Sequence, residues 1–385
     1  MARPSKSPPP RHRYTRTGDL AGRLRRRIVD GLYPPGGNLP TSRRLVAELG
    51  VSSVTVQHAL QVLAAEGFVH TAERRGAQVS ENPPHLAHYA LTFPFIERDL
   101  WMSGFYRSLR QAAQNLPLPR RFFFFYDIHG HVDSEDYRRL LVLVRQRRLA
   151  GVVFAHAVWP LIGLPITEDL GVPRVGIMSA DREVDFPVIY PDLAGATALA
   201  LDWLAAQGRR RVAHLAIANF GGWDAVRQLD WAGLAASRGM LTRPHWIQAV
   251  SANDPAWAGN VARLLVEGRD GERPDALVIH DDNLVLPATQ GIAEAGMDLP
   301  GDLAVVAQAN FPDLPPAAVP ARFVGFDTTR ILARCLELAD RQRCGTLRRH
   351  AELAPACWHE DLAARDAKEL APETGCLAGC SPRRA

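Results

Sequence analysis

Lysine is almost missing from this chain of 385 residues, since Lys6 and Lys368 are its only two. A pyridoxal enzyme needs a lysine in its core for the Schiff base, and both lysines lie in segments with the composition of tails, so that class is excluded. The sequence also lacks a phosphate-binding glycine loop, a histidine pair at metal spacing and a nucleophile-elbow motif. We therefore expect no catalysis, no cofactor and no metal.

Long apolar runs are also missing, although 47% of the residues are hydrophobic. No membrane-spanning helix is expected, and the N-terminal RPSKSPPPRHR segment lacks the apolar core of a secretory signal. The five cysteines are an odd number confined to the last sixth of the chain. This distribution argues against a disulfide framework and fits a reducing compartment, so we expect a soluble cytoplasmic protein of two or three domains.

Charge is divided unevenly along the chain. Residues 1–82 hold 13 Lys and Arg against 6 Asp and Glu, a net charge of +7, and the other 303 residues hold 32 against 35, a net charge of −3. A basic head on a mildly acidic body is typical of a DNA-binding domain joined to a domain with a different partner. Binding by such a head should weaken steeply with salt.

The stretch from Leu39 to Val79 predicts two short helices joined by a tight turn. Thr41 or Ser42 can cap the first helix, and Gly50 can end it. Ser52 can cap the second helix, so that helix, three-residue turn and helix have the spacing of a DNA-reading motif. Apolar residues at helical intervals predict a shared core of Leu45, Leu49, Val51, Val56, Ala59, Leu60 and Leu63.

Polar side chains remain for the outer face of the second helix. They are Ser52, Ser53, Thr55, Gln57 and His58. Short polar groups at the start of a helix suit base edges and phosphates. After Gly67 the pattern predicts a hairpin whose tip carries Arg74 and Arg75, and such a tip can lie along a DNA groove. The alternative is a packed three-helix unit whose basic face is merely solvated.

This region resembles the DNA-binding domain of the GntR family of bacterial transcriptional regulators. The resemblance covers roughly Tyr14 to Val79 and includes a first helix over Asp19–Asp30, followed by a glycine, an aromatic residue and prolines. Four arginines surround that helix, namely Arg23, Arg25, Arg26 and Arg27. The residues expected to contact double-stranded DNA are Arg43, Ser52, Ser53, Thr55, Gln57, His58, Arg74, Arg75 and Gly76. Ser53 and Gln57 replace arginines that are frequent in the family, so the operator of a relative need not apply.

From Tyr89 onward, apolar strand-like runs alternate with helical patterns. Strands are expected to begin near Ala90, Arg121, Gly151, Pro173, Val188, Val212, Trp246, Asp275, Leu303 and Phe323. Helices are expected over Gly104–Asn115, Ser134–Arg147, Leu193–Gln207, Val226–Arg238, Ala256–Glu267 and Asn283–Ala295. This alternation predicts doubly wound parallel sheets in two lobes, with ligands at the carboxyl ends of the strands. The aromatic run from Phe122 is expected to be a buried strand.

The segments from Tyr190 to Phe326 are similar to the effector domain of the LacI/GalR family, which shares its fold with periplasmic sugar-binding proteins. The matching features include Asp192 before a helix, Arg227 twelve residues before Gly239, and the PDALVIHDD run. The resemblance implies that Arg227 and Asp282 bind the hydroxyl groups of a small molecule, by preference a sugar. Arabinose-responsive repressors combine a head of the first family with a body of the second.

These ligand roles have plainer alternatives. Arg227 can be a surface charge on a helix, and Asp281 or Asp282 can simply cap the helix that follows them. The chain also departs from the family after Val306, where residues 307–310 are Ala-Gln-Ala-Asn in place of a glycine, an aromatic residue and an aspartate. The departure indicates an unusual ligand or a site that no longer works.

Trp101 and Trp223 are the aromatic residues expected to stack on a sugar ring. They come from a set of aromatic residues at loop positions that also includes Phe93, Trp159 and Trp231. Most aromatic side chains belong to protein cores, so we expect the other three to be buried.

The sequence therefore predicts an α/β protein with a winged helix-turn-helix and a two-lobed periplasmic-binding-protein-like domain. The expected segments are a disordered basic arm (1–13), the DNA-binding domain (14–82), a linker (83–88), the LacI-type effector domain (89–361) and a disordered tail (362–385). The expected function is that of a homodimeric repressor whose operator binding is modulated by a sugar, with no membrane partner. The alternative is a constitutive DNA-binding dimer without a working effector site.

Overall fold

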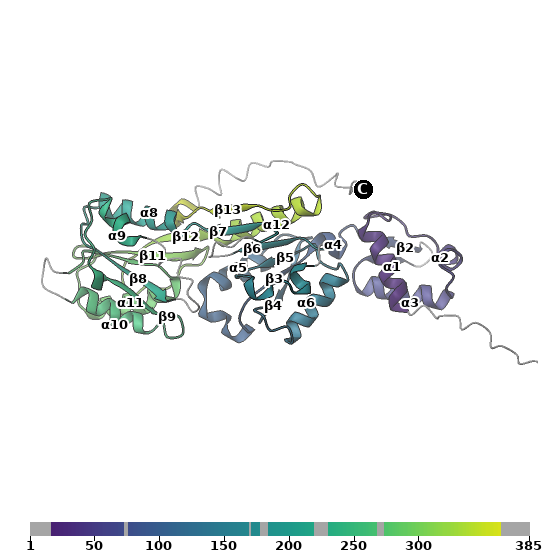
Figure 1. Ribbon diagram of the computed structural model, residues 1–385, viewed down its shortest axis with the longest axis horizontal. Coiled ribbons are helices and arrows are strands. Elements are labelled where there is room, and N and C mark those ends of the chain that lie inside the picture. The colour runs from purple at the N-terminus through teal and green to yellow at the C-terminus, as the bar shows by residue number, and fades with distance from the viewer. Residues whose placement is uncertain are drawn as a thin grey trace, which may run out of the picture. The chain divides into compact units, whose positions relative to one another are not determined.

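The computed structural model describes residues 17–72, 76–168, 171–177, 184–218, 230–267 and 273–362. These residues group into two compact units, shown with their elements in Figure 1. The first unit contains the described residues up to His88 together with residues 143–150. The second unit contains the other described residues from Tyr89 onward. Within the described residues, no helix has the length and apolar character needed to cross a membrane.

The first unit contains the predicted helix-turn-helix and its hairpin. Its elements are α1 (Thr17–Val29), α2 (Ser42–Leu49), α3 (Ser53–Ala65), β1 (Val69–Ala72) and β2 (Gly76–Val79). The Thr41 hydroxyl caps α2 by accepting the amide of Arg44 at 3.3 Å, and Gly50 ends α2 in the left-handed region at φ 63°. The Ser52 hydroxyl caps α3 by accepting the amide of Thr55 at 3.1 Å. The predicted starts of α2 and α3 and the predicted end of α2 are therefore confirmed.

One apolar core joins these three helices to the hairpin. It contains the predicted residues of α2 and α3 together with the inner face of α1, which are Leu45, Val56, Ala59, Leu60, Leu63, Leu20, Leu24 and Ile28. Leu49 and Val51 are partly buried against it. The hairpin strands pair antiparallel, from Val69 opposite Val79 to Ala72 opposite Gly76. The core fixes α3 with its polar face outward.

The segment that the sequence predicts as a polar linker over 83–88 contains a short helix, α4 (Pro84–Ala87). Proline at the first helical position favours this turn, because its missing N–H is not needed there. The ring of His85 is buried and stacks on Phe68 with 5.8 Å between centroids. Part of this segment is therefore packed rather than extended.

The second unit has two lobes, each built on a six-stranded sheet. The N-terminal lobe contains β3 (His88–Thr92), η1 (Glu97–Met102), α5 (Gly104–Gln114), β4 (Arg121–Phe125), α6 (Glu135–Arg145), β5 (Gly151–Phe154), η2 (Trp159–Leu161), α7 (Pro165–Glu168), β6 (Arg174–Ile177), β7 (Val188–Pro191), α12 (Thr328–Arg343) and β13 (Ala351–Ala354). Its strand order is β13-β7-β6-β5-β3-β4. Strand β13 pairs parallel with β7, β7 with β6, β6 with β5, and β5 with β3.

The C-terminal lobe has the strand order β14-β12-β11-β10-β8-β9. It contains α8 (Leu193–Ala206), β8 (Val212–Ala218), α9 (Trp231–Ala236), η3 (Pro244–Trp246), β9 (Ile247–Ser251), α10 (Trp257–Val266), β10 (Ala276–Ile279), α11 (Asp282–Glu294), β11 (Ala304–Phe311), β12 (Arg322–Asp327), β14 (Cys357–Trp358) and η4 (His359–Asp361). All its strand pairs are parallel except β12 with β14. Figure 1 shows α8 and α9 on one face of this sheet and α10 and α11 on the other, which confirms the predicted doubly wound architecture.

The chain passes between the two lobes three times. It crosses from β7 to α8, returns from β12 to α12, and crosses again from β13 to β14. The second crossing is held by hydroxyl groups, because Ser108 and Thr328 both donate to the carbonyl oxygen of Phe311, at 3.0 and 2.7 Å. Multiple crossings of this kind place the carboxyl ends of both sheets next to each other.

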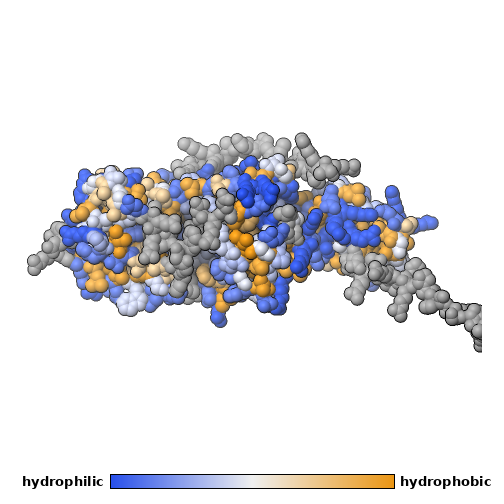
Figure 2. All heavy atoms as spheres, viewed as in Figure 1, coloured by the Kyte–Doolittle hydropathy of each residue, from blue (hydrophilic) through white to orange (hydrophobic). Residues whose placement is uncertain are grey.

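Two details differ from the sequence-based prediction. The aromatic run forms β4, which is not a buried strand: β4 is the edge of its sheet, and Phe123 is 42% exposed. Figure 2 shows hydrophobic surface in the region of β4 and α6. The prediction was wrong because an apolar run carries no information about how many neighbours its strand has. Helix α12 was also not predicted; Asp327 caps it by accepting the amide of Arg330 at 3.0 Å.

Candidate functional site

The start of α3 presents a polar face to solvent in the first unit. Ser52, Ser53, Gln57 and His58 are exposed, and Thr55 is partly exposed. The hydroxyls of Ser52 and Thr55 lie 2.8 Å apart, so both are held at the first turn of the helix. Helix N-termini favour phosphate, and polar side chains on such a turn suit base edges. The predicted DNA-contact residues of α3 are therefore brought together on one surface.

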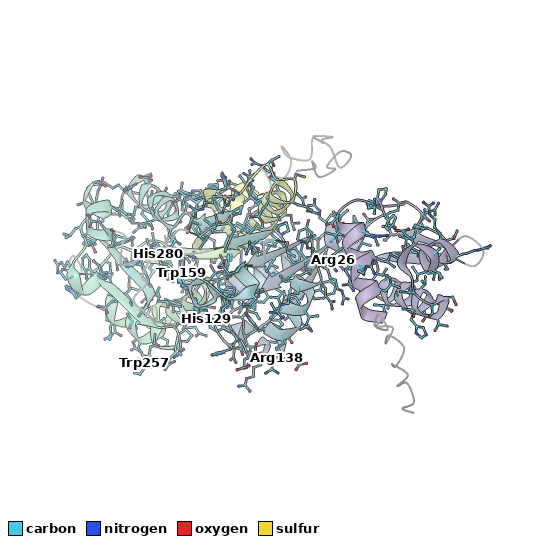
Figure 3. The ribbon with its side chains drawn as sticks, turned by 45° about the vertical axis from the view of Figure 1, so that its right-hand side comes forward. Arg26, His129, Arg138, Trp159, Trp257 and His280 are labelled. Carbon is cyan, nitrogen blue, oxygen red and sulfur yellow. The ribbon has the colours of Figure 1, made fainter. Side chains whose placement is uncertain are left out.

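The arginines of α1 divide into two groups. Arg25 is buried and donates through Nε and Nη2 to the Glu66 carboxylate at 3.0 and 2.8 Å. Arg27 donates to Glu48 at 2.7 Å and to the Tyr33 hydroxyl at 3.2 Å. These two arginines hold α1 to the rest of the unit. Arg23 and Arg26 are exposed instead, and Figure 3 labels Arg26.

Arg43 and Arg44 are exposed at the start of α2, and Arg43 was predicted to contact DNA. Val54 is a residue that the sequence analysis missed: it is 57% exposed on the first turn of α3. An exposed valine among hydroxyls is suited to the methyl group of thymine. The signal was available, because Val54 does not fall on the apolar spacing of the core. In the wing, Gly76 begins β2, whereas Arg74 and Arg75 lie outside the described residues.

A cavity of about 200 Å³ lies in the second unit at the carboxyl ends of strands from both lobes. Its polar lining residues are Ser103, His156, Asp281, Asp282, Asn283, Gln308 and Asn310. Its apolar wall includes Phe105, Tyr106, Ile177 and Phe326. The volume is smaller than the roughly 300–1,000 Å³ of sites for drug-sized ligands. This is the position at which open α/β sheets bind ligands.

The two aspartates at the end of β10 have different tasks. Asp281 caps α11, and its Oδ1 accepts both the backbone amide and the side-chain amide of Asn283 at 2.9 Å. Asp282 is the first residue of α11, and its Oδ2 accepts the side-chain amide of Asn310 at 2.8 Å. The capping alternative is therefore correct for Asp281, and both aspartates line the cavity.

Asp282 is also tightly enclosed from the other lobe. A Cβ atom on Gly104 would lie 1.8 Å from Asp282 Oδ2, so a larger residue at the start of α5 requires the Asp282 carboxylate to move. The Gly104 amide donates to Asn283 Oδ1 at 3.3 Å. Burial raises the pKa of both aspartates, and the charge of Asp282 raises the pKa of Asp281 further. The N-termini of α5 and α11 thus meet around one partly buried carboxylate pair.

Gln308 and Asn310 line the same cavity and were not predicted as ligand residues. Both belong to β11, where a two-residue spacing places them on the same face of the sheet. Gln308 Oε1 is buried and has no hydrogen-bond partner among the described residues. The departure from the family after Val306 therefore puts two amide side chains into the cavity.

The N-terminal lobe contributes neutral polar groups. His156 Nδ1 lies 3.0 Å from the carbonyl oxygen of Ala157, and Nε2 lies 3.2 Å from the Thr92 hydroxyl. These contacts are satisfied by the tautomer whose Nδ1–H donates to Ala157. Burial lowers the pKa of His156 to about 4 and raises that of Tyr106 to about 12, so both side chains are uncharged near neutral pH.

The other predicted effector ligands are not placed. Arg227 and Trp223 lie outside the described residues, and Trp101 belongs to η1 but its side chain is not described. Phe93 and Trp231 are buried, as expected for core aromatics, whereas Trp159 is only partly buried.

Trp231 packs in a buried cluster of rings within the C-terminal lobe. It stacks on His214 with 4.5 Å between centroids, and His280 lies 4.7 Å from His214. Figure 3 labels His280. Both nitrogens of His214 and the Trp231 indole nitrogen have no hydrogen-bond partner among the described residues. Burial lowers the pKa of His214 and His280, so this cluster is uncharged.

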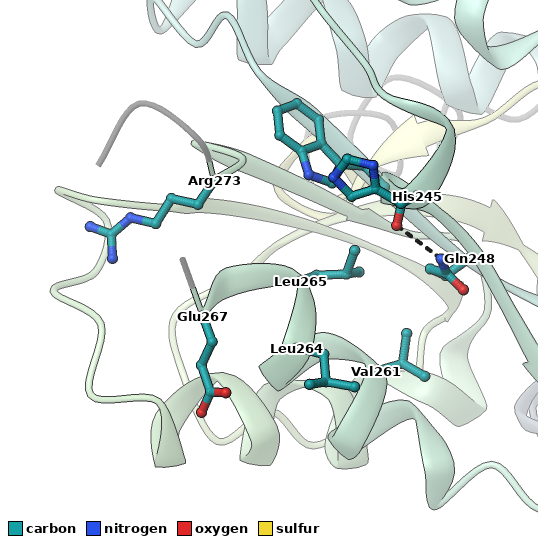
Figure 4. A pocket seen from close by; sticks show the side chains of 8 residues that line it. His245, Gln248, Val261, Leu264, Leu265, Glu267 and Arg273 are labelled. Atoms are coloured by element: carbon teal, nitrogen blue, oxygen red, sulfur yellow. Dashed lines mark hydrogen bonds between the residues drawn. The ribbon is translucent and has the colours of Figure 1, made fainter. Parts of the chain in front are cut away.

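A second cavity, of about 260 Å³, lies between α10 and the beginning of β9 (Figure 4). His245, Gln248, Glu267 and Arg273 line it together with leucines of α10, and Gln248 donates to the His245 carbonyl oxygen at 2.9 Å. It is larger than the first cavity, but it lies at the amino ends of β9 and β10. Ligands of such sheets bind at the carboxyl ends, so the first cavity is the candidate site.

Comparison with protein families identifies the two parts of the chain. Residues 16–79 match the family described as bacterial regulatory proteins, gntR family, and residues 201–355 match the periplasmic binding protein-like domain. The chain therefore combines a segment that matches the gntR family with a segment that matches the periplasmic binding protein-like domain.

Individual relatives and solved structures are similar to large parts of the chain. The chain is 23% identical over 313 residues to the arabinose metabolism transcriptional repressor of Geobacillus stearothermophilus, covering 74% of this chain and 79% of the relative. A LacI family transcriptional regulator from Lactobacillus casei with bound glucose superposes with a TM-score of 0.52 at 18% identity, over 71% of this chain and 97% of the other. A putative LacI regulator from Bacillus cereus subsp. cytotoxis gives a TM-score of 0.54 at 15% identity, over 71% and 96%. The structural likenesses establish the fold of the body.

Proposed function

We propose that this protein is a cytoplasmic, ligand-responsive transcriptional repressor that binds an operator through its head and a small carbohydrate through the cavity of its body. The observation that carries the proposal is the pairing of an exposed, capped recognition helix with a polar cavity at the carboxyl ends of two sheets. The name of the arabinose repressor and the glucose bound to a LacI-type relative support a carbohydrate effector and repression.

In the head, the proposed contacts fall into two kinds. Arg43, with Arg74 and Arg75 of the wing, neutralises phosphate charge, while Ser52, Ser53, Thr55, Gln57 and His58 approach base edges. Gly76 permits the turn of the wing, since its φ is 78°. Val54 extends the set as a contact for a thymine methyl group.

Two substitutions separate these kinds of contact. Gln57→Ala should weaken operator binding about tenfold and leave binding to scrambled DNA unchanged, because it removes a base contact. Arg43→Ala should weaken both about equally and lower the slope of affinity against salt by about one, because it removes a phosphate contact. Fluorescence anisotropy with labelled upstream DNA and a scrambled duplex measures both. Equal losses for Gln57→Ala on the two duplexes would contradict its assignment.

A homodimer accounts best for operator recognition, because two-fold heads read inverted repeats. The described surface offers a suitable face on α10, where Trp257 is 58% and Leu264 is 71% exposed. These residues are seven positions apart, so they lie on the same face of the helix; Figure 3 labels Trp257. Leu264→Glu should give a monomer in sedimentation analysis, whereas Leu118→Glu, at an equally exposed leucine away from α10, should remain dimeric.

The second candidate is a constitutive DNA-binding dimer with no working effector site. The formed cavity favours the ligand-responsive function instead, and its wall contains the oxygen of Gln308, which has no hydrogen-bond partner among the described residues. A thermal-shift screen against pentoses and hexoses distinguishes the two, because a ligand that binds only the folded protein raises its melting temperature. The absence of any shift would favour the constitutive dimer.

A further inference from the structure

The first unit contains a segment that lies far from the head in the sequence. Residues 143–150, the last turn of α6 and the turn that leads into β5, belong to the same compact unit as the head. We refer to them as the α6–β5 segment. Leu149 and Ala150 are buried, and the Ala150 amide donates to the carbonyl oxygen of His88 at 2.6 Å. The segment is therefore a packed part of the unit that contains the recognition helix α3.

The α6–β5 segment contacts the C-terminal end of α3. Glu66 caps that end, and its side chain is only 12% exposed. Its carboxylate accepts hydrogen bonds from Nε and Nη2 of Arg25, and Arg148 Nη1 lies 3.6 Å from Glu66 Oε1. Water and salt screen an ion pair less in such a partly buried place than on the open surface. One carboxylate thus joins α1, α3 and the α6–β5 segment.

A second ion pair connects the segment to the end of α1. Arg147 Nη1 lies 3.4 Å from Asp30 Oδ1, and the Asp30 amide donates to the carbonyl oxygen of Arg26 at 2.8 Å, which extends the last turn of α1. Arg147 has a φ of 52°, in the left-handed region that residues other than glycine, asparagine and aspartate rarely adopt. The backbone therefore disfavours an arginine at this position, and the contact with Asp30 gives that arginine a role.

The acidic partners are scarce in the head. Residues 1–82 hold 6 Asp and Glu against 13 Lys and Arg. Asp30 and Glu66 are two of those six, and the segment places Arg147 and Arg148 beside them. A basic segment would be repelled by most of the surface of a basic head. Charge complementarity at both contacts therefore favours this one attachment.

The α6–β5 segment continues directly into a strand that leads to the cavity. Strand β5 begins one residue after the segment, and all four of its residues are buried. The residues that follow β5, which are Ala155, His156 and Ala157, line the cavity. A strand of four residues is about 13 Å long. Rigid, packed elements of this kind carry energetic coupling between sites.

Resting on the proposed function, we infer that the α6–β5 segment positions the recognition helix and couples it to effector binding. Arg148 is a positioning residue that acts through Glu66 at the end of α3, and Arg147 acts through Asp30 at the end of α1. Contacts at the ends of two helices restrict the orientation of the head on the segment, and preorganisation of this kind favours operator binding. A shift of β5 on effector binding acts on both contacts.

Charge reversal tests the positioning role without any effector. Arg148→Glu places a like charge beside Glu66, and Arg147→Asp does so beside Asp30, while aspartate tolerates the left-handed backbone. Each should weaken operator binding at least threefold more than Arg145→Glu, the matched control at an exposed arginine of the same segment. Anisotropy with labelled upstream DNA measures the affinities, and circular dichroism checks that each variant is folded. Losses no greater than that of Arg145→Glu would overturn the inference.

A charge exchange separates a lost contact from general destabilisation. Asp30→Arg combined with Arg147→Asp restores opposite charges with their positions exchanged, so operator binding should return to within twofold of the unaltered protein. The ratio of operator to scrambled-DNA affinity corrects for the arginine added to the head. A double variant that binds no better than Arg147→Asp alone would show that this ion pair does not position the head.

Sugars test the coupling. Pentoses and hexoses, including arabinose and glucose, are titrated into the full-length protein with and without upstream DNA. For a sugar that shifts operator affinity, Arg148→Glu should reduce that shift at least fivefold and change the affinity of the DNA-free protein for the sugar less than twofold. A full shift in Arg148→Glu would contradict coupling through the segment and leave ligand control intact. If no sugar shifts the operator affinity of the unaltered protein, carbohydrate control and its coupling both fail, and the charge reversals still decide whether the segment positions α3.

Discussion

The two recognition surfaces of this protein present their polar groups in opposite ways. In the head, Ser53 and Gln57 are exposed and directed to solvent, beside exposed arginines. In the cavity, Asp281 and Asp282 are partly buried and bonded to neighbouring amides. The exposed surface of the head is suited to a large anionic partner such as DNA. The cavity is suited to a small molecule whose donors match hydrogen-bond acceptors that the protein already holds in place.

The largest expected difference between the two surfaces is in how their binding affinities depend on salt concentration. With several phosphate contacts per dimer, operator affinity is expected to fall about 1,000-fold between 50 and 200 mM salt, because counterions compete with the arginines. Binding of an uncharged effector should change less than twofold over the same range. Anisotropy for DNA and titration calorimetry for the effector give the two slopes. Parallel slopes would mean that the effector is charged or that the sites are not distinct.

Within the head, the arginines of α1 provide the same contrast between a buried side chain, Arg25, and an exposed one, Arg26. Arg25→Ala should destabilise the head by about 2 kcal/mol, because the partly buried carboxylate of Glu66 loses its hydrogen bonds from Arg25 and keeps Arg148, 3.6 Å away, as an ion-pair partner. Arg26→Ala should leave the stability unchanged and weaken DNA binding moderately. Chemical denaturation followed by circular dichroism, with anisotropy on the same samples, measures both. A head that tolerates Arg25→Ala as well as Arg26→Ala would contradict the assignment of Arg25 to the fold.

Two glycines provide a matched pair across the two units. Gly104→Ala should lower effector affinity by about 2 kcal/mol, or roughly thirtyfold, since its Cβ displaces the Asp282 carboxylate. Gly22→Ala, in α1, places its new Cβ more than 4 Å from every described atom outside the neighbouring helix backbone and should stabilise the head by about 0.5–1 kcal/mol. Calorimetry and thermal unfolding give the two values. Unchanged effector binding in Gly104→Ala would show that Asp282 does not hold the ligand.

The smallest effect is expected in the ring cluster of the C-terminal lobe. His214→Phe should raise the stability of the body by about 1 kcal/mol, because it keeps the stack on Trp231 and removes two buried nitrogens that have no partner within the described part of the chain. Trp231→Phe serves as a comparison that removes the indole nitrogen but also shrinks the stack. Thermal unfolding measures both. A loss of stability in His214→Phe would indicate that a hydrogen-bond partner of His214 exists.

The head could be predicted closely because its signals are local. Thr41, Gly50 and Ser52 set the helix limits within a few residues of the groups they bond, and the structure confirms all three. What could not be predicted is which arginines of α1 are exposed, because the partner of Arg25 is Glu66, 41 residues away.

The cavity could be predicted only in part, because residues far apart in the sequence form it. The position of Asp282 after a buried strand was predicted, and so was the capping alternative, which applies to Asp281. Gln308 and Asn310 were noticed only as departures, although their alternation along an apolar strand is a signal for a shared face. The approach of Gly104 to Asp282 depends on how the two lobes close, which the sequence pattern does not contain.

The most direct test of the central claim is the anisotropy of labelled upstream DNA with the full-length protein at fixed salt, titrated in the absence and presence of each neutral sugar. The account predicts tight binding to the upstream DNA and at least a tenfold shift in affinity with one sugar. Tight binding that no small molecule changes would contradict ligand control by the body. Failure to bind the upstream DNA even at low salt would contradict the operator-binding role of the head.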